Sequence, residues 1–325
     1  MILFTAVLCG FLLDYLFGDP NWIPHPVTYI GKYIAWLEPR LRARFPADQK
    51  GERRAGRRLV FYVILTVGGG SAAILTAAWF IHPVLFFALQ TLWCWQCLAY
   101  RGLKSAAEQV RYCLEAGDLP GARTSLRALV GRDVEQLNRS GAICATVESV
   151  AENTNDGILA PLLYMLIGGA PLALTYKAIN TMDSMVGYQN EKYIDFGRAA
   201  AKTDDAAGWL PARLGQLLLR QGACLSRGTS GKGAKRIHRR DANKTQSPNA
   251  GQMESVAAGA LGIRLGGPAS YGGVVFDKPY LGDRTRRPET GDIVLAEKMS
   301  AKATYLLLIF GLLIRMIAMI FISSL

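Results

Sequence analysis

The sequence offers little histidine or cysteine with which to bind a metal. Its three histidines lie far apart, at His25, His82 and His238. The six cysteines show no paired framework, which does not favour a disulfide scaffold. Cys94 and Cys97 lie inside an apolar, tryptophan-rich stretch, so we expect neither redox nor zinc chemistry there. The sequence therefore predicts no zinc site and reduced thiols.

Two signatures of nucleotide-binding and transport proteins are also missing. No GxxxxGK[ST] run occurs, which excludes an ordinary P-loop. We find no internal repeat, although many transporters are built from repeated halves. The first residues carry no basic leader and no small-residue cleavage site, so we do not expect a removed signal peptide.

Long hydrophobic runs are abundant. Half of the residues are hydrophobic, and the stretches 59–81 and 83–100 contain no charged residue. Both have about the 20 residues that a bilayer-spanning helix needs. The stretches 2–17 and 303–323 are weaker candidates because each contains charge. We predict an all-α integral membrane protein with about four transmembrane helices, a re-entrant helical hairpin and cytoplasmic helical segments.

Two basic runs stand out in a chain whose net charge is +12. The first lies in a short loop at 32–58, which the positive-inside rule places in the cytoplasm. The chain then crosses outward at 59–81 and returns at 83–100. The second run, at 227–244, is rich in Gly and Ser and is predicted to be a mobile loop. Both runs fit topology and lipid headgroups, or attraction of polyanionic substrates, and we expect no nucleic-acid partner.

Three regions are predicted along the chain. Residues 1–100 hold the N-terminal membrane helices and the basic cytoplasmic loop. Residues 101–302 form a cytoplasmic and re-entrant catalytic region, which begins with a short helical hairpin at 101–130. Residues 303–325 form a C-terminal transmembrane helix.

A break interrupts the apolar stretch 158–176. The letters GGAP stand at 168–171, and two glycines with a proline disfavour a continuous helix. The ten residues before the break reach only about 15 Å. A re-entrant pair of short helices is therefore predicted, with both polar ends, 148–156 and 176–188, at the cytoplasmic face.

Carboxylates gather at the first polar end. On a helix predicted for 134–156, Glu148, Glu152 and Asp156 lie within about 80° of one another. Like charges so close repel unless a cation or substrate offsets them. The spacing indicates a Mg²⁺ site at the membrane surface, and a solvated helix face is the alternative.

The second polar end repeats this chemistry. Asn180 and Asp183 share a helix face that Lys177 borders. Hard oxygen ligands beside a cation are typical of a magnesium-phosphate site, although polar residues that only finish a helix give the same pattern. Asp204 and Asp205 follow downstream, so acids recur in three places.

A turn at 247–251, SPNAG, precedes a helix rich in small residues. We predict that this helix begins near Glu254 and ends at Gly266-Gly267. The N-terminus of a helix presents free N–H groups to an anion. Ser247 and Asn249 are therefore candidate phosphate-binding residues.

Several long motifs occur together and in a fixed order. They are GDPNWIPHPVTYIG at 18–31, LVGRD at 129–133, ESVAENTNDGILAPL at 148–162, YKAINTMDSMVGY at 176–188, FGRAAAKTDD at 196–205 and SPNAG at 247–251. Over essentially its full length the sequence closely resembles the CobD/CbiB family. The resemblance implies an integral membrane adenosylcobinamide-phosphate synthase of cobalamin biosynthesis. Such an enzyme uses ATP and Mg²⁺ to join a propionate carboxylate of adenosylcobyric acid to the amine of (R)-1-aminopropan-2-ol phosphate.

The resemblance and the residues together suggest a site. The expected metal ligands are Glu148, Glu152, Asp156 and Asp183. The expected substrate and phosphate ligands are Lys177, Arg213, Asn153, Asn180, Ser247 and Asn249. The expected catalytic residues are Asp204 or Asp205, as base or second metal ligand, and His25. His25 would bind the amino-alcohol phosphate or shuttle a proton, and its alternative role is that of a turn residue at the membrane edge.

The expected partners are the corrinoid, an amino-alcohol phosphate, which could also be ethanolamine phosphate, and membrane lipid. The next membrane enzyme of the pathway is a further candidate partner. We expect the protein in the inner membrane with its active site facing the cytoplasm. Two other readings stay open: a Mg²⁺-dependent membrane prenyl or alcohol-phosphate transferase, and a non-enzymatic transport or assembly protein.

Overall fold

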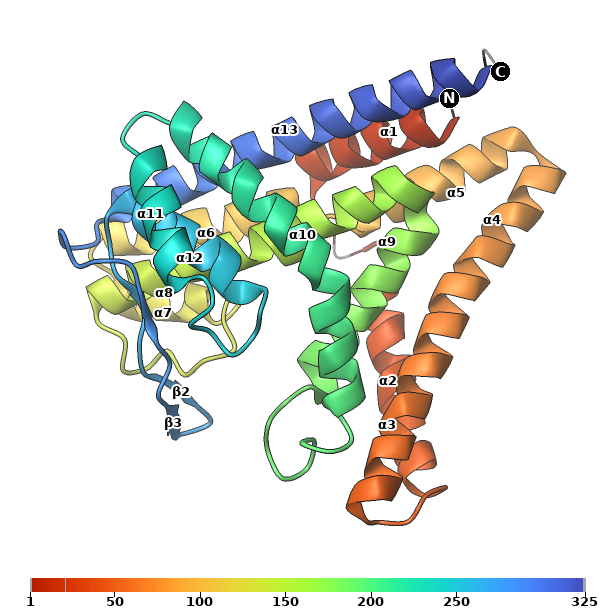
Figure 1. Cartoon of the computed structure of the whole chain (residues 1–325), viewed down its shortest axis with the longest axis horizontal. Coiled ribbons are helices and arrows are strands. Elements are labelled where there is room, and N and C mark those ends of the chain that lie inside the picture. The colour runs from red at the N-terminus through yellow and green to blue at the C-terminus, as the bar shows by residue number, and fades with distance from the viewer. Residues whose placement is uncertain (1, 21, 324–325) are drawn as a thin grey trace. The chain divides into compact units, whose positions relative to one another are not determined.

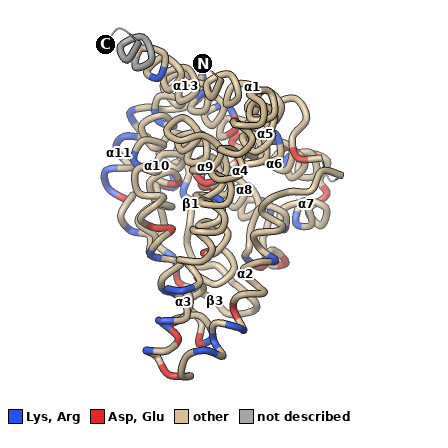
Figure 2. The backbone as a smooth tube through the Cα atoms, turned by 90° about the vertical axis from the view of Figure 1, so that its right-hand side faces the viewer, with Lys and Arg blue, Asp and Glu red and all other residues tan. Residues whose placement is uncertain are grey.

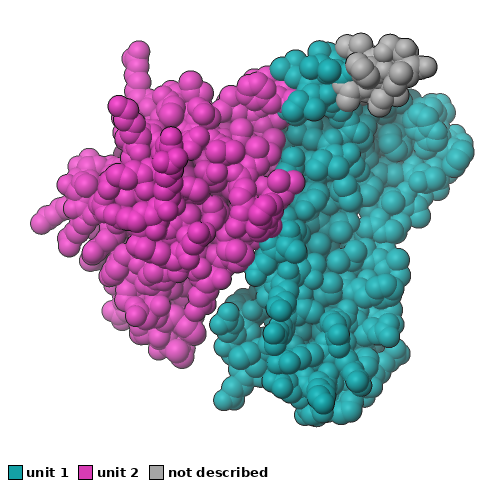
Figure 3. Space-filling model, viewed as in Figure 1, with its two compact units in different colours: residues 1–99, 160–208, 311–325 teal, residues 100–159, 209–310 magenta. Residues whose placement is uncertain are grey.

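The computed structural model describes residues 2–20 and 22–323, with side chains up to Ile317. The described chain is mostly helical with almost no sheet (Figure 1). It divides into two compact units (Figure 3). Unit 1 consists of residues 1–99, 160–208 and 311–325, and unit 2 of residues 100–159 and 209–310. The prediction of an all-α membrane protein is confirmed by this content and by the apolar helices described next.

Three helical stretches are long and apolar enough to cross a membrane: Gln49–Ile81, Arg139–Val186 and Thr290–Ile317. Ile2–Phe17 is apolar but shorter. The prediction that residues 83–100 form a bilayer-spanning helix is not supported, because α5 runs only from Pro83 to Gln96. Its 14 residues reach about 21 Å, less than the roughly 30 Å of a bilayer core.

Unit 1 is built from apolar helices. Its elements are α1 (Ile2–Phe17), α2 (Pro26–Arg42), α3 (Gln49–Ile64), the π-helical turn η1 (Leu65–Gly69), α4 (Gly70–Ile81), α5, α9 (Ala160–Val186) and the first turns of α10 (Arg198–Leu225). The expected loop at 32–58 is wrong, because most of it is helical in α2 and α3. In Figure 2 many of the charges of α2 and α3 lie toward one end of these helices.

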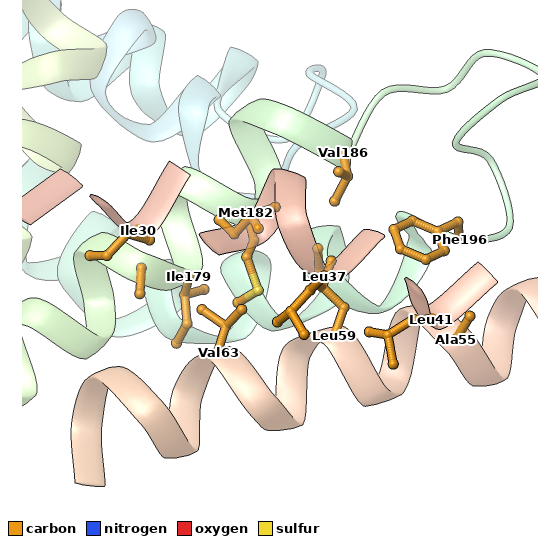
Figure 4. Close-up of a cluster of buried hydrophobic side chains, with 13 residues drawn as sticks. Ile30, Leu37, Leu41, Ala55, Leu59, Val63, Ile179, Met182, Val186 and Phe196 are labelled. Atoms are coloured by element: carbon orange, nitrogen blue, oxygen red, sulfur yellow. The ribbon is translucent and has the colours of Figure 1, made fainter. Parts of the chain in front are cut away.

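The core of unit 1 lies where α2, α3 and α9 meet (Figure 4). On α2, the buried residues Ile30, Ile34, Leu37 and Leu41 repeat at helical spacing and form one apolar stripe. Leu59 of α3 is among the residues packed with it. The helical spacing of apolar residues that brings these helices into contact is thus already present in the sequence.

The predicted break in α9 is present. Gly168 and Gly169 have non-helical angles, and Gly169 has a φ of 72°, which favours glycine. Tyr164 before the break and Tyr176 after it stack with ring centroids 5.3 Å apart. The two arms therefore fold toward each other as a hairpin.

Arg315 of α13 (Thr290–Ser323) contacts this break. A helix that ends leaves its last carbonyl groups without helical partners. The Arg315 guanidinium donates to the carbonyl oxygens of Leu166 and Ile167. This contact explains a charged residue inside the last apolar segment.

Unit 2 surrounds α8 and α12. Its elements are α6 (Tyr100–Glu115), α7 (Leu119–Leu126), α8 (Arg139–Thr154), the π-helical turn η2 (Asn155–Leu159), the rest of α10, α11 (Gly231–Asp241), α12 (Ala250–Leu261), the strands β1 (Leu265–Gly266), β2 (Ala269–Tyr271), β3 (Val274–Phe276) and β4 (Tyr280–Leu281), and most of α13. Helices α6 and α7 confirm the hairpin expected at 101–130. Strand β1 pairs antiparallel with β4, and β2 with β3.

The predicted mobile loop at 227–244 is wrong, because it contains α11. Ser230 caps this helix by accepting from the N–H of Gly233 at 2.9 Å. Ala234 and Ile237 are buried. A Cβ on Gly233 would lie 2.3 Å from the carbonyl oxygen of Gly259 in α12, so only glycine permits this crossing. Tertiary packing therefore orders a segment whose composition resembles a loop.

Candidate functional site

A cavity of about 460 Å³ opens in unit 2. Its wall comes from segments that are far apart in the sequence. They are residues 129–132, Glu148, Ser149 and Glu152 of α8, residues 245–247, Ala250 and Glu254 of α12, Gly266, Gly267, Tyr271, and residues 276–279. Three of the sequence motifs, LVGRD, ESVAENTND and SPNAG, meet here.

Glu148 is held in place at the cavity wall. It is only 4% exposed, and its carboxylate pairs with the guanidinium of Arg132. The backbone N–H of Gly266 donates to its other oxygen at 2.6 Å. A buried carboxylate needs such partners, because burial without them is costly. Glu148 therefore fixes the cavity wall rather than offering a free ligand.

Glu152 and Glu254 have no such partners. No described side chain forms a hydrogen bond or ion pair with either carboxylate. Partial burial raises the pKa of Glu254 to about 8, and the charges of Glu152 and Glu148 add to the rise. The positive charges of Lys278 and Arg132 act against this rise and offset it only in part.

The cavity holds one cation that is not paired with a carboxylate among its described lining residues. Arg132 is engaged by Glu148, whereas Lys278 donates to the hydroxyl of Tyr271. The Lys278 ammonium also lies 4.7 Å from the centre of the Tyr271 ring. Lys278 therefore faces the cavity with its charge available to an anionic group.

The glycines at 266 and 267 shape the cavity floor. Their φ angles are 72° and 88°, which L side chains rarely adopt. A Cβ on Gly266 would lie 2.4 Å from the carbonyl oxygen of Pro279. The N–H that binds Glu148 depends on this close approach.

Two predicted residues of the first polar end do not line the cavity. Asp156 accepts from the side-chain amide of Asn155 at 2.7 Å, and Asn153 donates to the carbonyl oxygen of Ser149 at 2.9 Å. The α-helical spacing ends where η2 begins at Asn155, since a π-helical turn changes the rotation per residue. The helix itself starts at Arg139 rather than at 134.

The predicted anion site at the start of α12 is already occupied by side chains. The hydroxyl of Ser247 accepts from the N–H of Asn249 at 3.2 Å. The hydroxyl of Thr245 accepts from the N–H of Gly251 at 3.1 Å. The helix begins at Ala250 and ends at Leu261, so both predicted ends were wrong. It ends early because Gly262 adopts the left-handed conformation.

Arg213 and Asn249, both predicted to bind phosphate, contact each other. The Arg213 guanidinium donates to the side-chain oxygen of Asn249 at 2.8 Å. It also lies 4.7 Å from the ring centre of Trp209. Neither residue is among the described residues that line the cavity.

The remaining predicted residues belong to unit 1. They are His25, Lys177, Asn180, Asp183, Asp204 and Asp205. The side-chain amide of Asn180 donates to Asp204 at 3.4 Å, so the structure brings these two together. Their catalytic, phosphate-binding and metal-binding roles stay predictions, as does a single pocket shared with Glu148 and Glu152.

His25 has a structural position that the sequence had left open. Its Nδ1 accepts from the N–H of Val27 at 3.3 Å, which caps α2. Its Nε2 lies 3.7 Å from Asp19. Burial lowers the pKa of His25 and raises that of Asp19, with the attraction between the two groups acting against both shifts. A neutral imidazole is what the cap requires.

A preformed metal cage is not found in the part of the chain that the structure describes. There, no group of three His, Cys, Asp or Glu side chains is placed to hold an ion. Glu152 and Glu254 nevertheless supply oxygen donors that suit a hard cation. Further donors would have to come from a bound substrate or from water.

Sequence reasoning missed Glu254, Arg132 and Lys278 as cavity residues. Arg132 lies in the quoted LVGRD motif, and Glu254 follows SPNAG by three residues, so both had a local signal. Lys278 had none, because it reaches the cavity only through the β2–β3 hairpin that precedes it.

Comparison with known proteins gives one consistent result. The family described as "CobD/Cbib protein" matches residues 7–300. Cobalamin biosynthesis protein CobD of Geobacter metallireducens is 47% identical over 279 residues, which are 86% of this chain and 86% of that protein. Cobalamin biosynthesis protein CbiB of Salmonella typhimurium is 44% identical over 284 residues, or 87% and 88%. Cobalamin biosynthesis protein CobD of Clostridium perfringens is 39% identical over 311 residues, or 96% and 98%. No solved structure matches.

Proposed function

The chain belongs to the CobD/CbiB family and thus has a role in cobalamin biosynthesis, and we propose that it is an ATP-dependent amide ligase. In this proposal it joins a propionate carboxylate of adenosylcobyric acid to the amine of (R)-1-aminopropan-2-ol phosphate or ethanolamine phosphate. The product is adenosylcobinamide phosphate or its shorter analogue. The reaction takes place at the inner membrane with the site facing the cytoplasm.

The observation that supports this proposal is the unit 2 cavity with its two unpartnered carboxylates. Carboxylates in a partly buried space whose charge the protein offsets only in part favour binding of a divalent cation. Glu152 and Glu254 would hold Mg²⁺ there, and the ion would offset the charge of the ATP phosphates. Lys278 adds a positive charge at the same cavity.

The proposed ligase reaction needs positive charge beside its phosphoryl groups. A carboxylate oxygen is a poor leaving group, so the γ-phosphoryl group of ATP is first transferred to it, which gives an acyl phosphate and ADP. The neutral amine then attacks the acyl carbon, inorganic phosphate leaves, and a base accepts the amine proton. Negative charge accumulates on the phosphoryl oxygens in both steps. Cations fixed beside those oxygens therefore lower the barrier.

Arg132 supports this arrangement without contacting the reacting atoms. Arg132 pairs with the Glu148 carboxylate and so fixes the group that accepts a hydrogen bond from the N–H of Gly266. The cavity wall then stays in one geometry while substrates bind. Preorganisation of this kind avoids rearrangement during the reaction.

The test uses detergent-purified protein with ATP, Mg²⁺ and both substrates. We expect the amide product, ADP and phosphate in equal amounts, and no ATP turnover when either substrate is left out. The variant Glu152→Gln should lose at least about a hundredfold in rate. The matched control is Glu135→Gln, which changes an exposed acid of the same unit and should leave the rate unchanged.

Two results would contradict the proposal. Absence of amide product from the wild-type protein would exclude the ligase. Transfer of a prenyl or alcohol-phosphate group without ATP consumption would instead support the transferase that the sequence left open. Full activity of Glu152→Gln would remove this carboxylate from the site.

A further inference from the structure

The β2–β3 hairpin is an exposed apolar element. Val274, Val275 and Phe276 are 59%, 69% and 47% exposed. Successive side chains of a strand point to opposite faces, so the hairpin presents apolar surface on both. Figure 1 shows β2 and β3 extending beyond the helices of unit 2. Contiguous exposed apolar surface is typical of a binding site.

The hairpin is fixed to the rest of unit 2 through Asp133. The Asp133 carboxylate accepts from the N–H groups of Gly272 and Gly273 at 3.0 and 2.8 Å and from the hydroxyl of Ser270. The N–H of Asp133 donates to the carbonyl oxygen of Ser270 at 2.8 Å. An isolated two-stranded hairpin is barely stable, so these bonds hold it in one position. A rigid apolar surface loses little entropy when it binds a ligand.

The apolar surface of the hairpin is continuous with the polar cavity. Tyr271 and Phe276 both line the cavity. Their rings meet edge to face, 5.6 Å apart at 82°. Lys278 follows directly and bonds to the Tyr271 hydroxyl. A ligand that lies on the hairpin would therefore reach Lys278 and the carboxylates with its polar edge.

We propose that the β2–β3 hairpin binds the large macrocyclic acid, with the apolar face of the ring on Val274 and Phe276 and one side-chain carboxylate beside Lys278. This inference rests on the proposed function, which supplies a corrinoid as substrate. A corrinoid is a wide amphipathic ring with carboxylate or amide arms at its edge. The hairpin and cavity together present the matching sequence of surfaces: apolar, then cationic, then the cluster of carboxylates.

Charge distinguishes this occupant from a membrane surface. Asp133 binds the turn of the hairpin at Gly272 and Gly273, and Asp277 follows β3 and also lines the cavity. Carboxylates at this position repel anionic lipid headgroups, whereas membrane-binding elements carry Lys and Arg around their apolar residues. These carboxylates therefore disfavour an extended anionic bilayer surface, whereas Lys278 offers a positive charge to a single carboxylate of a ligand.

The experiment measures two dissociation constants on the full-length protein in detergent. Adenosylcobyric acid is titrated without ATP and followed by its absorbance, and Mg²⁺-ATP is titrated separately. For the double variant Val274→Ser/Phe276→Ala, we expect the corrinoid Kd to rise about tenfold. The Kd of Mg²⁺-ATP should change less than about twofold. The control variant Tyr112→Ala removes an equally exposed aromatic residue of α6 and should change neither constant.

A second variant reports the occupant directly. Val274→Trp places a fluorophore on the face of the hairpin that is proposed to hold the ring, and bound corrinoid should quench the added emission in nanodiscs. Quenching by brominated lipid instead, with no effect of corrinoid, would overturn the inference in favour of a membrane contact. An unchanged corrinoid Kd in Val274→Ser/Phe276→Ala would also overturn it while leaving the ligase intact. Failure of the wild-type protein to bind the corrinoid would sink the proposed function as well.

Discussion

At the scale of single residues, Glu254 shows how burial of a carboxylate beside other acids affects stability. Its pKa in the folded protein is about 8, against 4.5 when unperturbed. The folded state therefore holds the proton more tightly than the unfolded state does. The stability that this group contributes is complete below pH about 4.5 and is lost as the pH rises toward 8.

We expect Glu254→Gln to remove this loss. The thermal midpoint of the substrate-free wild-type protein should fall between pH 6 and pH 9, and that of the variant should fall less. Each kcal/mol recovered corresponds to a rise of about 2–4 °C. Differential scanning fluorimetry in detergent at both pH values measures the effect. Parallel declines in the two proteins would show that Glu254 does not carry the charge cost.

The ion pair between Arg132 and Glu148 leads to a second prediction about stability. Arg132→Met leaves a carboxylate that is 4% exposed without its cation, and such a loss costs about 3–5 kcal/mol. Arg132→Met/Glu148→Gln removes the orphan charge and should regain part of that stability. Chemical denaturation of the two variants provides the comparison. Equal stability of both would mean that water replaces the guanidinium.

At the scale of elements, the bend at Gly266 can be tested with a matched glycine. Gly266→Ala forces a side chain at a φ of 72°, against the carbonyl oxygen of Pro279. We expect a loss of about 1–3 kcal/mol and weaker Mg²⁺-ATP binding, because the N–H that binds Glu148 moves. Gly102→Ala, in α6 with no atom within 4 Å of the new carbon, should be neutral or stabilising. Similar losses in both variants would contradict the assignment.

The cap of α2 depends on a neutral imidazole. Burial lowers the pKa of His25 below 6.5, so the unfolded chain takes up a proton first as the pH falls. The stabilisation by the cap is complete above pH about 6.5 and is lost as the pH falls through the lowered pKa. We expect loss of the cap to accelerate exchange of the Val27 amide, so that its protection factor is lower at pH 5 than at pH 8. His25→Asn keeps an N-cap oxygen and should abolish this acceleration, measured by hydrogen exchange with mass spectrometry.

Local chemistry explains which elements could be predicted. The break at Gly168-Gly169 and the shared face of Glu148 and Glu152 follow from backbone freedom and helical period, so the sequence alone was sufficient. Helix α11 was missed because Ala234 and Ile237 become buried only when α12 is present. The cavity could not be predicted for a similar reason, because Lys278 follows a hairpin that is distant in the sequence. Asp156 does not line the cavity because a π-helical turn changes the spacing after Thr154.

At the scale of the whole molecule, the orientation in the membrane can be measured. The basic start of α3 is expected in the cytoplasm, so His82 at the far end of the Gln49–Ile81 helix should lie outside. In a variant whose other cysteines are replaced, His82→Cys should react with a membrane-impermeant maleimide on intact spheroplasts. A protein that retains only Cys224, which is exposed, should react only after permeabilisation. The reverse pattern would invert the topology.

The contact between Arg315 and the break in α9 also bears on the order of events during synthesis. The chain leaves unit 1 after residue 99, returns at 160, leaves again after 208 and returns at 311. A ribosome delivers residues from the N-terminus onward, so the carbonyl groups of Leu166 and Ile167 emerge about 150 residues before the guanidinium that binds them. Until then these carbonyl groups lack their guanidinium partner. A segment translated about 150 residues after the break therefore completes this part of unit 1.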